Sequence, residues 1–154
     1  MAIRHWHLDS GSIRINNFPE NEIQLTVPII MFVNTISVAI DSTGVKAYTA
    51  RAYISSETVK HAKKGVLYAH AQTPSATDAV VRVELVDDTT GDTIAYVTYS
   101  GDSGLKNTII SEDTIKALSG HEVYIRINVT TASATAGATQ NFIMSYFAIV
   151  LGIR

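Results

Sequence analysis

An alternation of apolar and polar residues near the middle of the chain sets the class of structure: Asp78-Ala79-Val80-Val81-Arg82-Val83-Glu84-Leu85-Val86. Side chains two positions apart on a β-strand share one face of the sheet. The apolar residues Val81, Val83 and Leu85 are therefore predicted to face a core. Arg82 and Glu84 then face outward, so this segment is predicted to be a half-buried strand.

The residues that follow this strand have the composition of a tight turn. Residues 87–92 read Asp-Asp-Thr-Thr-Gly-Asp, in which Gly91 suits a left-handed or bulge position. A hairpin is therefore predicted between 80–86 and 93–99. Residues 122–130 alternate in the same way, with inward positions predicted at Val123, Ile125, Ile127 and Val129.

The composition extends this prediction to the rest of the chain. There are 18 Ile, 14 Val and 17 Thr residues against 7 Leu, and such an excess of β-branched residues favours strands. Further strands are predicted near residues 11–16, 22–27, 29–40, 45–54, 65–72 and 139–153. The chain is thus expected to be an all-β, two-sheet sandwich of about eight strands, built as a single domain over residues 1–154.

Two short helical turns are predicted to interrupt the strands, at 55–65 and 111–120. Each opens with a capping serine and an acidic residue and ends with lysine and glycine. An offset of 56 residues superimposes them, placing Ser55 on Ser111 and Tyr68 on Tyr124. A structural repeat and a chance match are both open at this point, and two successive Greek keys would leave such a repeat.

Charge and composition exclude several classes of function. The 154 residues are 46% hydrophobic and only 17% charged, with a net charge of −2 and no cysteine. Direct nucleic-acid binding is therefore not expected, because no positive field is available for a phosphate backbone. No apolar run reaches the roughly 20 residues that span a bilayer, so membrane insertion is not expected. The start of the chain lacks the apolar core of a signal peptide, so export is not expected either.

The last segment, 142–153, is apolar on both faces if its alternation is regular. One face would carry Phe142, Met144, Tyr146, Ala148 and Val150, and the other Ile143, Phe147, Ile149, Leu151 and Ile153. Such a strand needs a second cover, from residues 1–20 acting as an N-terminal arm or from another subunit. The residues expected at such an interface are Trp6, Phe18, Phe142, Met144, Phe147, Ile149 and Leu151.

No catalytic, cofactor-binding or metal site is predicted. His5 and His7 lack a third ligand, and His61, His70 and His121 are scattered. An enzyme is therefore not expected. A carbohydrate platform is the alternative that the aromatic residues leave open, since Trp6 and outward-facing tyrosines could stack on sugars; the tyrosines considered are Tyr96, Tyr99 and Tyr124.

Residues 79–94 and 118–127 resemble the second half of small jelly-roll domains, through the run AVVRVELVDDTTGDTI and the later run LSGHEVYIRI. The resemblance covers about residues 50–153. It is strongest to the single jelly-roll capsid proteins of icosahedral viruses, archaeal viruses among them, and weaker to jelly-roll carbohydrate-binding modules.

The resemblance implies a structural, self-assembling virion protein. Its partners would be copies of itself and other capsid proteins, and it would be made in the host cytoplasm and reside in the capsid. The alternative implied is a non-catalytic carbohydrate-binding module, or a virion surface domain that binds a receptor, with a glycan as its ligand.

Overall fold

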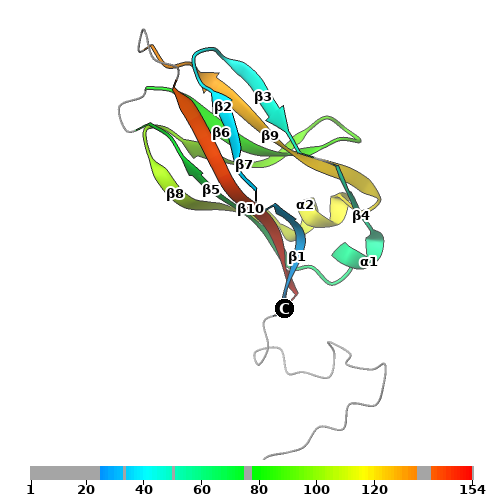
Figure 1. Ribbon diagram of the computed structural model, residues 1–154. Helices are drawn as coiled ribbons and strands as arrows, with labels where there is room; N and C mark the ends of the chain where they lie inside the picture. The colour runs from blue at the N-terminus through cyan, green and yellow to red at the C-terminus, as the bar shows by residue number, and fades with distance from the viewer. Residues whose placement is uncertain (1–24, 33, 50, 75–77, 135–139, 154) are drawn as a thin grey trace, which may run out of the picture.

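The structure, a computed structural model, describes residues 25–32, 34–49, 51–74, 78–134 and 140–153. Within these residues lie ten strands and two short helices (Figure 1). In chain order they are β1 (Leu25–Phe32), β2 (Ile36–Ala39), β3 (Gly44–Tyr48), β4 (Ala52–Ile54), α1 (Ser56–Val59), β5 (Lys64–Gln72), β6 (Val80–Asp87), β7 (Thr93–Tyr99), β8 (Ser103–Ser111), α2 (Glu112–Ala117), β9 (His121–Thr131) and β10 (Asn141–Ile153).

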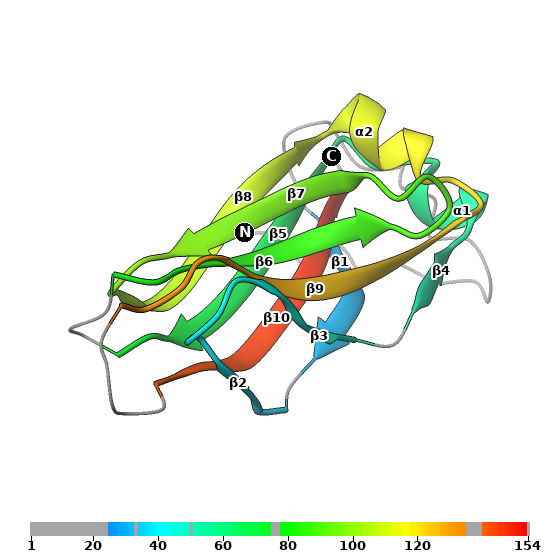
Figure 2. The same cartoon turned by 90° about the horizontal axis from the view of Figure 1, so that it is seen from above.

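The strands form two antiparallel sheets packed face to face (Figures 1 and 2). The first sheet has the order β1-β10-β5-β8, and β2 also pairs with β10. The second has the order β3-β9-β6-β7, and β4 also pairs with β9. Because β1 and β2 share one neighbour and β3 and β4 share another, each pair acts as one interrupted strand, which reduces the ten strands to eight.

Renumbered as eight strands, the two sheets have the orders 1-8-3-6 and 2-7-4-5. This is the topology of a jelly roll, in which two Greek keys fold over each other. The expected all-β sandwich with two short helical turns is therefore confirmed. The fold alone assigns no function, since jelly rolls include both capsid and lectin domains.

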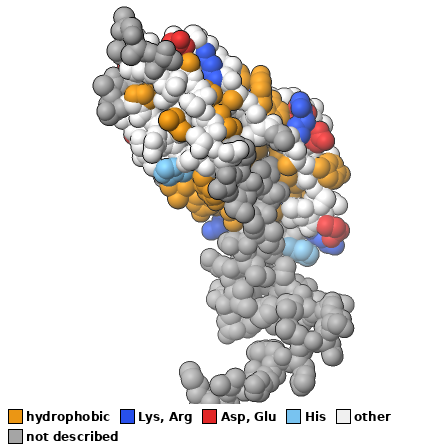
Figure 3. All heavy atoms as spheres, viewed as in Figure 1, with side chains coloured by type: hydrophobic (Ala, Val, Ile, Leu, Met, Phe, Trp, Pro, Cys, Tyr) orange, Lys and Arg blue, Asp and Glu red, His pale blue; other side chains and the backbone are white. Residues whose placement is uncertain are grey.

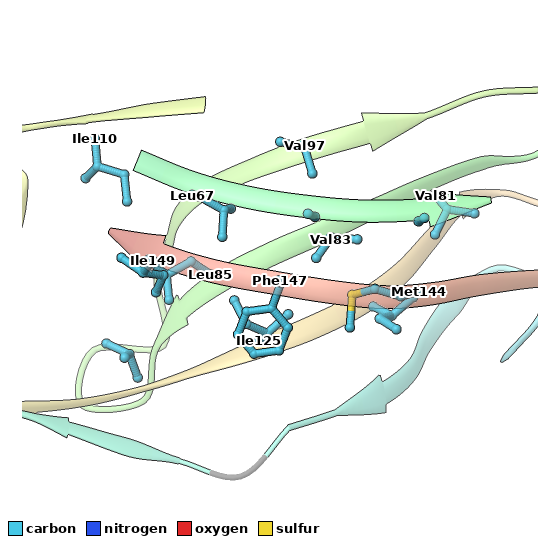
Figure 4. Close-up of a cluster of buried hydrophobic side chains, with 14 of the residues drawn as sticks. Leu67, Val81, Val83, Leu85, Val97, Ile110, Ile125, Met144, Phe147 and Ile149 are labelled. Carbon is cyan, nitrogen blue, oxygen red and sulfur yellow. The ribbon is translucent and has the colours of Figure 1, made fainter. Parts of the chain in front are cut away.

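The core lies between the sheets and follows the alternation of the sequence. The side chains predicted to face inward on β6 and β9 are each 1% exposed or less. Leu67 of β5 and Phe147 of β10 meet them from the opposite sheet (Figure 4). Tyr99 is buried among them, and its hydroxyl donates to the carbonyl of Ala69 at 2.6 Å, which satisfies the one polar atom of the side chain.

The two helical turns have matching caps. The Ser55 hydroxyl accepts from the amide of Thr58 at 3.2 Å, and the Ser111 hydroxyl accepts from the amide of Thr114 at 3.3 Å. Each turn connects one sheet to the other: α1 links β4 to β5, and α2 links β8 to β9. The two turns lie at the same end of the sandwich (Figure 2). The 56-residue offset therefore relates two elements with the same local structure.

The regular alternation expected for β10 is wrong, because the strand contains a β-bulge. The register against β5 shifts between Met144 and Tyr146, so Ser145 is an extra residue. Beyond the bulge the odd-numbered residues, beginning with Phe147, face inward. Phe142 and Phe147 therefore point into the same core. The Ser145 hydroxyl lies 2.9 Å from Nδ1 of His70, which anchors the bulge to β5.

Most predicted strands are found, with shifted ends. The segment 29–40 is divided between β1 and β2, and 45–54 is divided between β3 and β4. The predicted strand at 11–16 lies outside the described residues. One strand was not predicted at all: β8, which forms an edge of the first sheet.

Candidate functional site

A hollow of about 330 Å³ opens at the edge of the second sheet, where β3 ends. It is lined by Tyr48, Thr49, Arg51 and Tyr124, and we call it the tyrosine hollow. The Tyr48 side chain is 64% exposed. Its ring meets the Tyr124 ring edge-on, with 5.8 Å between ring centres. The hollow therefore presents an aromatic wall to solvent.

Arg51 lies beside the two tyrosines and is bonded to Asp88. Its guanidinium makes two hydrogen bonds to the Asp88 carboxylate, through Nε and through one terminal nitrogen at 3.1 Å. It also lies over the Tyr124 ring, 5.6 Å from the centroid. The bond to Asp88 raises the pKa of Arg51, which stays charged. Of its five N–H donors two face Asp88, which leaves three for a ligand.

The strand ladder fixes the floor of the tyrosine hollow. The Thr49 amide donates to the carbonyl of Ile125 at 2.9 Å. The Ile125 amide in turn donates to the Thr49 hydroxyl at 2.9 Å. Both bonds continue the pairing of β3 with β9 beyond the end of β3, so the two tyrosines are attached to one rigid support.

A row of side chains extends from the tyrosine hollow across the outer face of the second sheet. The strand registers place Tyr48 opposite Arg126, Arg126 opposite Glu84 and Glu84 opposite Tyr96. Glu84 is only 3% exposed although it points outward, because Arg126 covers it and donates to it at 2.7 Å. Asn128 also donates to Glu84, at 3.3 Å. We call Tyr48, Arg126, Glu84 and Tyr96 the outer row.

A second aromatic group ends the outer row. The Arg82 guanidinium stacks over the Tyr96 ring, 4.5 Å from its centroid. Beneath this stack the Nε atom of Arg82 is buried and has no hydrogen-bond partner among the described residues. Tyr96 is 46% exposed. The face thus carries a tyrosine with an arginine over its ring at each side, and between them Arg126 paired with the buried Glu84.

An Asp–His pair lies near the β6–β7 turn. Asp87 is buried and lies 2.7 Å from Nδ1 of His121. It also accepts from the Thr89 amide at 2.9 Å. This geometry orients a histidine as in a catalytic triad, but within the described residues no hydrogen bond joins the other ring nitrogen to a hydroxyl nucleophile. The bonds from Thr89 and His121 tie the β6–β7 turn to the start of β9.

The Asp87–His121 pair is expected to make stability depend on acid. Burial by itself raises the pKa of Asp87, but the hydrogen bonds from His121 and Thr89 outweigh it and leave the pKa below its usual value of 3.8. A depressed pKa contributes stability above the unfolded value that is lost as the pH falls through the folded one. Urea denaturation at several pH values between 6 and 2 measures this. The free energy of unfolding should fall less with decreasing pH for Asp87→Asn than for the wild type; equal decreases would contradict the prediction.

The structure places the predicted interface residues inside the chain. Five of them are 2% exposed or less and fill the sandwich core: Phe142, Met144, Phe147, Ile149 and Leu151. The expectation that they contact a neighbouring subunit is corrected, because the bulge at Ser145 turns them all to one inward face. Trp6 and Phe18, like the whole arm at 1–20, lie outside the described residues.

The tyrosines of the predicted sugar platform separate into two groups. Tyr96 and Tyr124 face outward as expected, but Tyr99 is buried, and burial raises its pKa to about 12. Tyr48 and Arg51 were missed. They lie in a segment predicted as one strand, 45–54, whose interruption opens the tyrosine hollow.

Within the described residues, no group of three or more His, Asp or Glu side chains is arranged to hold a metal ion. His5 and His7 lie outside those residues. None of the described helices is long and apolar enough to cross a membrane.

Similarity to known proteins is found among solved structures, and not among protein families or curated sequences. Among solved structures the chain is similar to the EclA C-terminal domain, described as a sugar-binding protein, with a TM-score of 0.42 and 9% sequence identity. The alignment covers 93% of this chain and 89% of that one.

Proposed function

We propose that this jelly roll is a non-catalytic glycan-binding domain whose primary subsite is the tyrosine hollow. The observation that carries the proposal is the exposed ring of Tyr48 beside a fixed arginine. A sugar ring has an apolar face of C–H groups and a rim of hydroxyls. An exposed aromatic ring covers the former, and directed donors bind the latter.

The rigidity of the tyrosine hollow supports this function. Asp88 bonds Arg51, the β3–β9 ladder fixes the backbone of both tyrosines, and the two rings contact each other, which lowers the side-chain freedom lost on binding. The volume of about 330 Å³ lies at the lower end of the ~300–1,000 Å³ typical of small-molecule sites, which suits one unit of a glycan.

The outer row extends the site. Tyr48 and Tyr96 stand on strands three steps apart, roughly 14 Å at the usual strand spacing. A short oligosaccharide can span that distance, stacking on Tyr48 at one end and on Tyr96 at the other. Between them the guanidinium of Arg126, whose side chain is 23% exposed, offers N–H donors for hydroxyls.

Glycan-array screening of the full chain, followed by calorimetry with the best oligosaccharide, tests the proposal. Tyr48→Ala should weaken binding at least about tenfold. Tyr53→Ala is the matched control, because Tyr53 is also 64% exposed but does not line the tyrosine hollow. The glycan should be recovered unchanged. An array without hits, or equal affinities for both variants, would contradict the assignment.

A self-assembling structural role is the second candidate, and the exposed apolar side chains of β8 favour it. The capsid role implied by the sequence resemblance stays a prediction. It can no longer depend on the core residues of β10.

A further inference from the structure

The edge strand β8 has the features of a surface that pairs with another strand. It is nine residues long and pairs with β5 along its whole length. Within the described part of the chain, no strand pairs with its other side. Such an edge presents backbone N–H and C=O groups that are ready to extend a sheet.

Two large apolar side chains stand exposed on this edge. Leu105 is 59% exposed and Ile109 is 71% exposed, the latter more than any other large hydrophobic residue described. They share the outer face of the first sheet, where Ile109 lies opposite Val66 and Leu105 opposite His70. Figure 3 shows hydrophobic side chains gathered where Figure 1 has β5 and β8.

None of the outward-facing residues of β8 is charged, so an exposed lysine, a common protection of edge strands, is missing from that face. Proteins commonly keep edges apart with an exposed lysine, a proline or a bulge. The one charged residue of β8, Lys106, is turned to the other side of the sheet. Its ammonium donates to the carbonyl of Thr98 at 2.7 Å and pairs with Asp102, so its charge is occupied within the chain.

The sequence of β8 is complementary to itself. In an antiparallel pair with a second copy, centred on Asn107, each Leu105 lies opposite Ile109 of the other copy, and each Ser103 lies opposite Ser111. Lys106 then faces Thr108. A register centred one residue earlier would set Lys106 against Lys106 and separate the apolar pairs, so the Asn107-centred register is favoured on charge and on packing.

We propose that two copies of this chain associate through β8, in an antiparallel pair centred on Asn107 that joins their first sheets into one. The contact is isologous, as a two-fold axis requires. One strand edge with two apolar pairs buries less than the ~800 Å² per partner of a standard interface. We therefore expect a weak dimer, with a dissociation constant on the order of 10–100 µM. The inference does not depend on glycan binding.

Sedimentation velocity of the full chain measures the association. The wild type should move from 16.7 kDa towards twice that mass as its concentration rises from about 5 to 300 µM. Ile109→Lys should remain monomeric and folded, because the side chain is exposed and its replacement disturbs no core contact. Tyr53→Lys, an equally conservative test on the second sheet, should dimerise like the wild type. A monomeric wild type, or an Ile109→Lys variant that still dimerises, would overturn the proposal.

Disulfide trapping tests the register, because the chain has no cysteine of its own. Asn107→Cys places the two sulfurs opposite each other across the axis, at a Cα separation of about 4.5–5.5 Å that a disulfide can bridge. Ser103→Cys on the same strand is the control, since its two copies would lie eight residues apart, roughly 27 Å. Mild oxidation should crosslink Asn107→Cys at least about tenfold faster. Equal rates for the two variants would overturn the register.

Discussion

Replacing Phe147 with aspartate is expected to abolish folding. Phe147 is 1% exposed and packs in the centre of the core, against side chains from both sheets (Figure 4). The substitution removes the ring and introduces a carboxylate without a partner. Truncation to alanine alone costs about 3–5 kcal/mol, and the buried charge adds several more. The sum reaches the 5–15 kcal/mol that typically holds a domain together.

Circular dichroism and urea denaturation of Phe147→Asp and Phe147→Ala provide the measurement. Tyr146→Asp is the matched control, because Tyr146 is the adjacent residue on β10 but faces outward beyond the bulge and is only half-buried. It should fold. A folded Phe147→Asp protein that had lost only its self-association would reinstate Phe147 as a subunit contact and refute the inward orientation.

The alternation of the sequence predicted the central strands well because nothing in them competes with the period of two. β6 and β9 lie in the middle of the second sheet, with one face on the core, and their inward residues are those expected. In β10 the same reasoning was wrong at one point, the bulge at Ser145. Both of its faces are apolar, so the sequence pattern could not show where Ser145 interrupts the period.

β8 was missed because its composition argues locally against a strand. It contains Gly104, Lys106 and Asn107, all unfavourable in strands, and only its last apolar residue, Ile110, is buried. The strand exists because β5 supplies a complete ladder of partners. Tertiary pairing has overridden local propensity, and the edge position allows the outward residues to be of any type.

The tyrosine hollow could not be predicted for a different reason. Tyr48 and Tyr124 are 76 residues apart, and they meet only because β3 pairs with β9. Arg51 joins them through Asp88, which belongs to the turn after β6. Three separate segments must be placed before the site exists, and an alternation pattern carries no information on which strands become neighbours.

The two proposals concern opposite sides of the molecule. The outer row lies on the second sheet, whereas β8 lies at the edge of the first. A dimer through β8 would therefore leave both tyrosine hollows open. Two sites on one rigid body bind a multivalent glycan surface more tightly than either site alone, so weak dimerisation and weak glycan binding would reinforce each other.

The second large effect is expected at the outer row, for Arg126→Leu. Arg126 covers Glu84, which is 3% exposed, and donates to its carboxylate at 2.7 Å. Without Arg126 the carboxylate keeps only the bond from Asn128 at 3.3 Å. Breaking a buried pair from one side costs about 3–5 kcal/mol, and since Arg126 is itself partly exposed, we expect roughly 2–3 kcal/mol here.

A double-mutant cycle with Glu84→Leu separates two contributions to the free energy of unfolding: the lost hydrogen bond and the unpaired buried carboxylate. The double variant Glu84→Leu with Arg126→Leu should recover most of the stability, because no unpaired charge remains and leucine packs well on a sheet face. Urea denaturation of all four proteins gives the coupling. If Arg126→Leu costs under about 0.5 kcal/mol, water must reach Glu84. The ion pair in the outer row would then be solvated, and Arg126 would be too loosely held to orient the hydroxyls of a glycan.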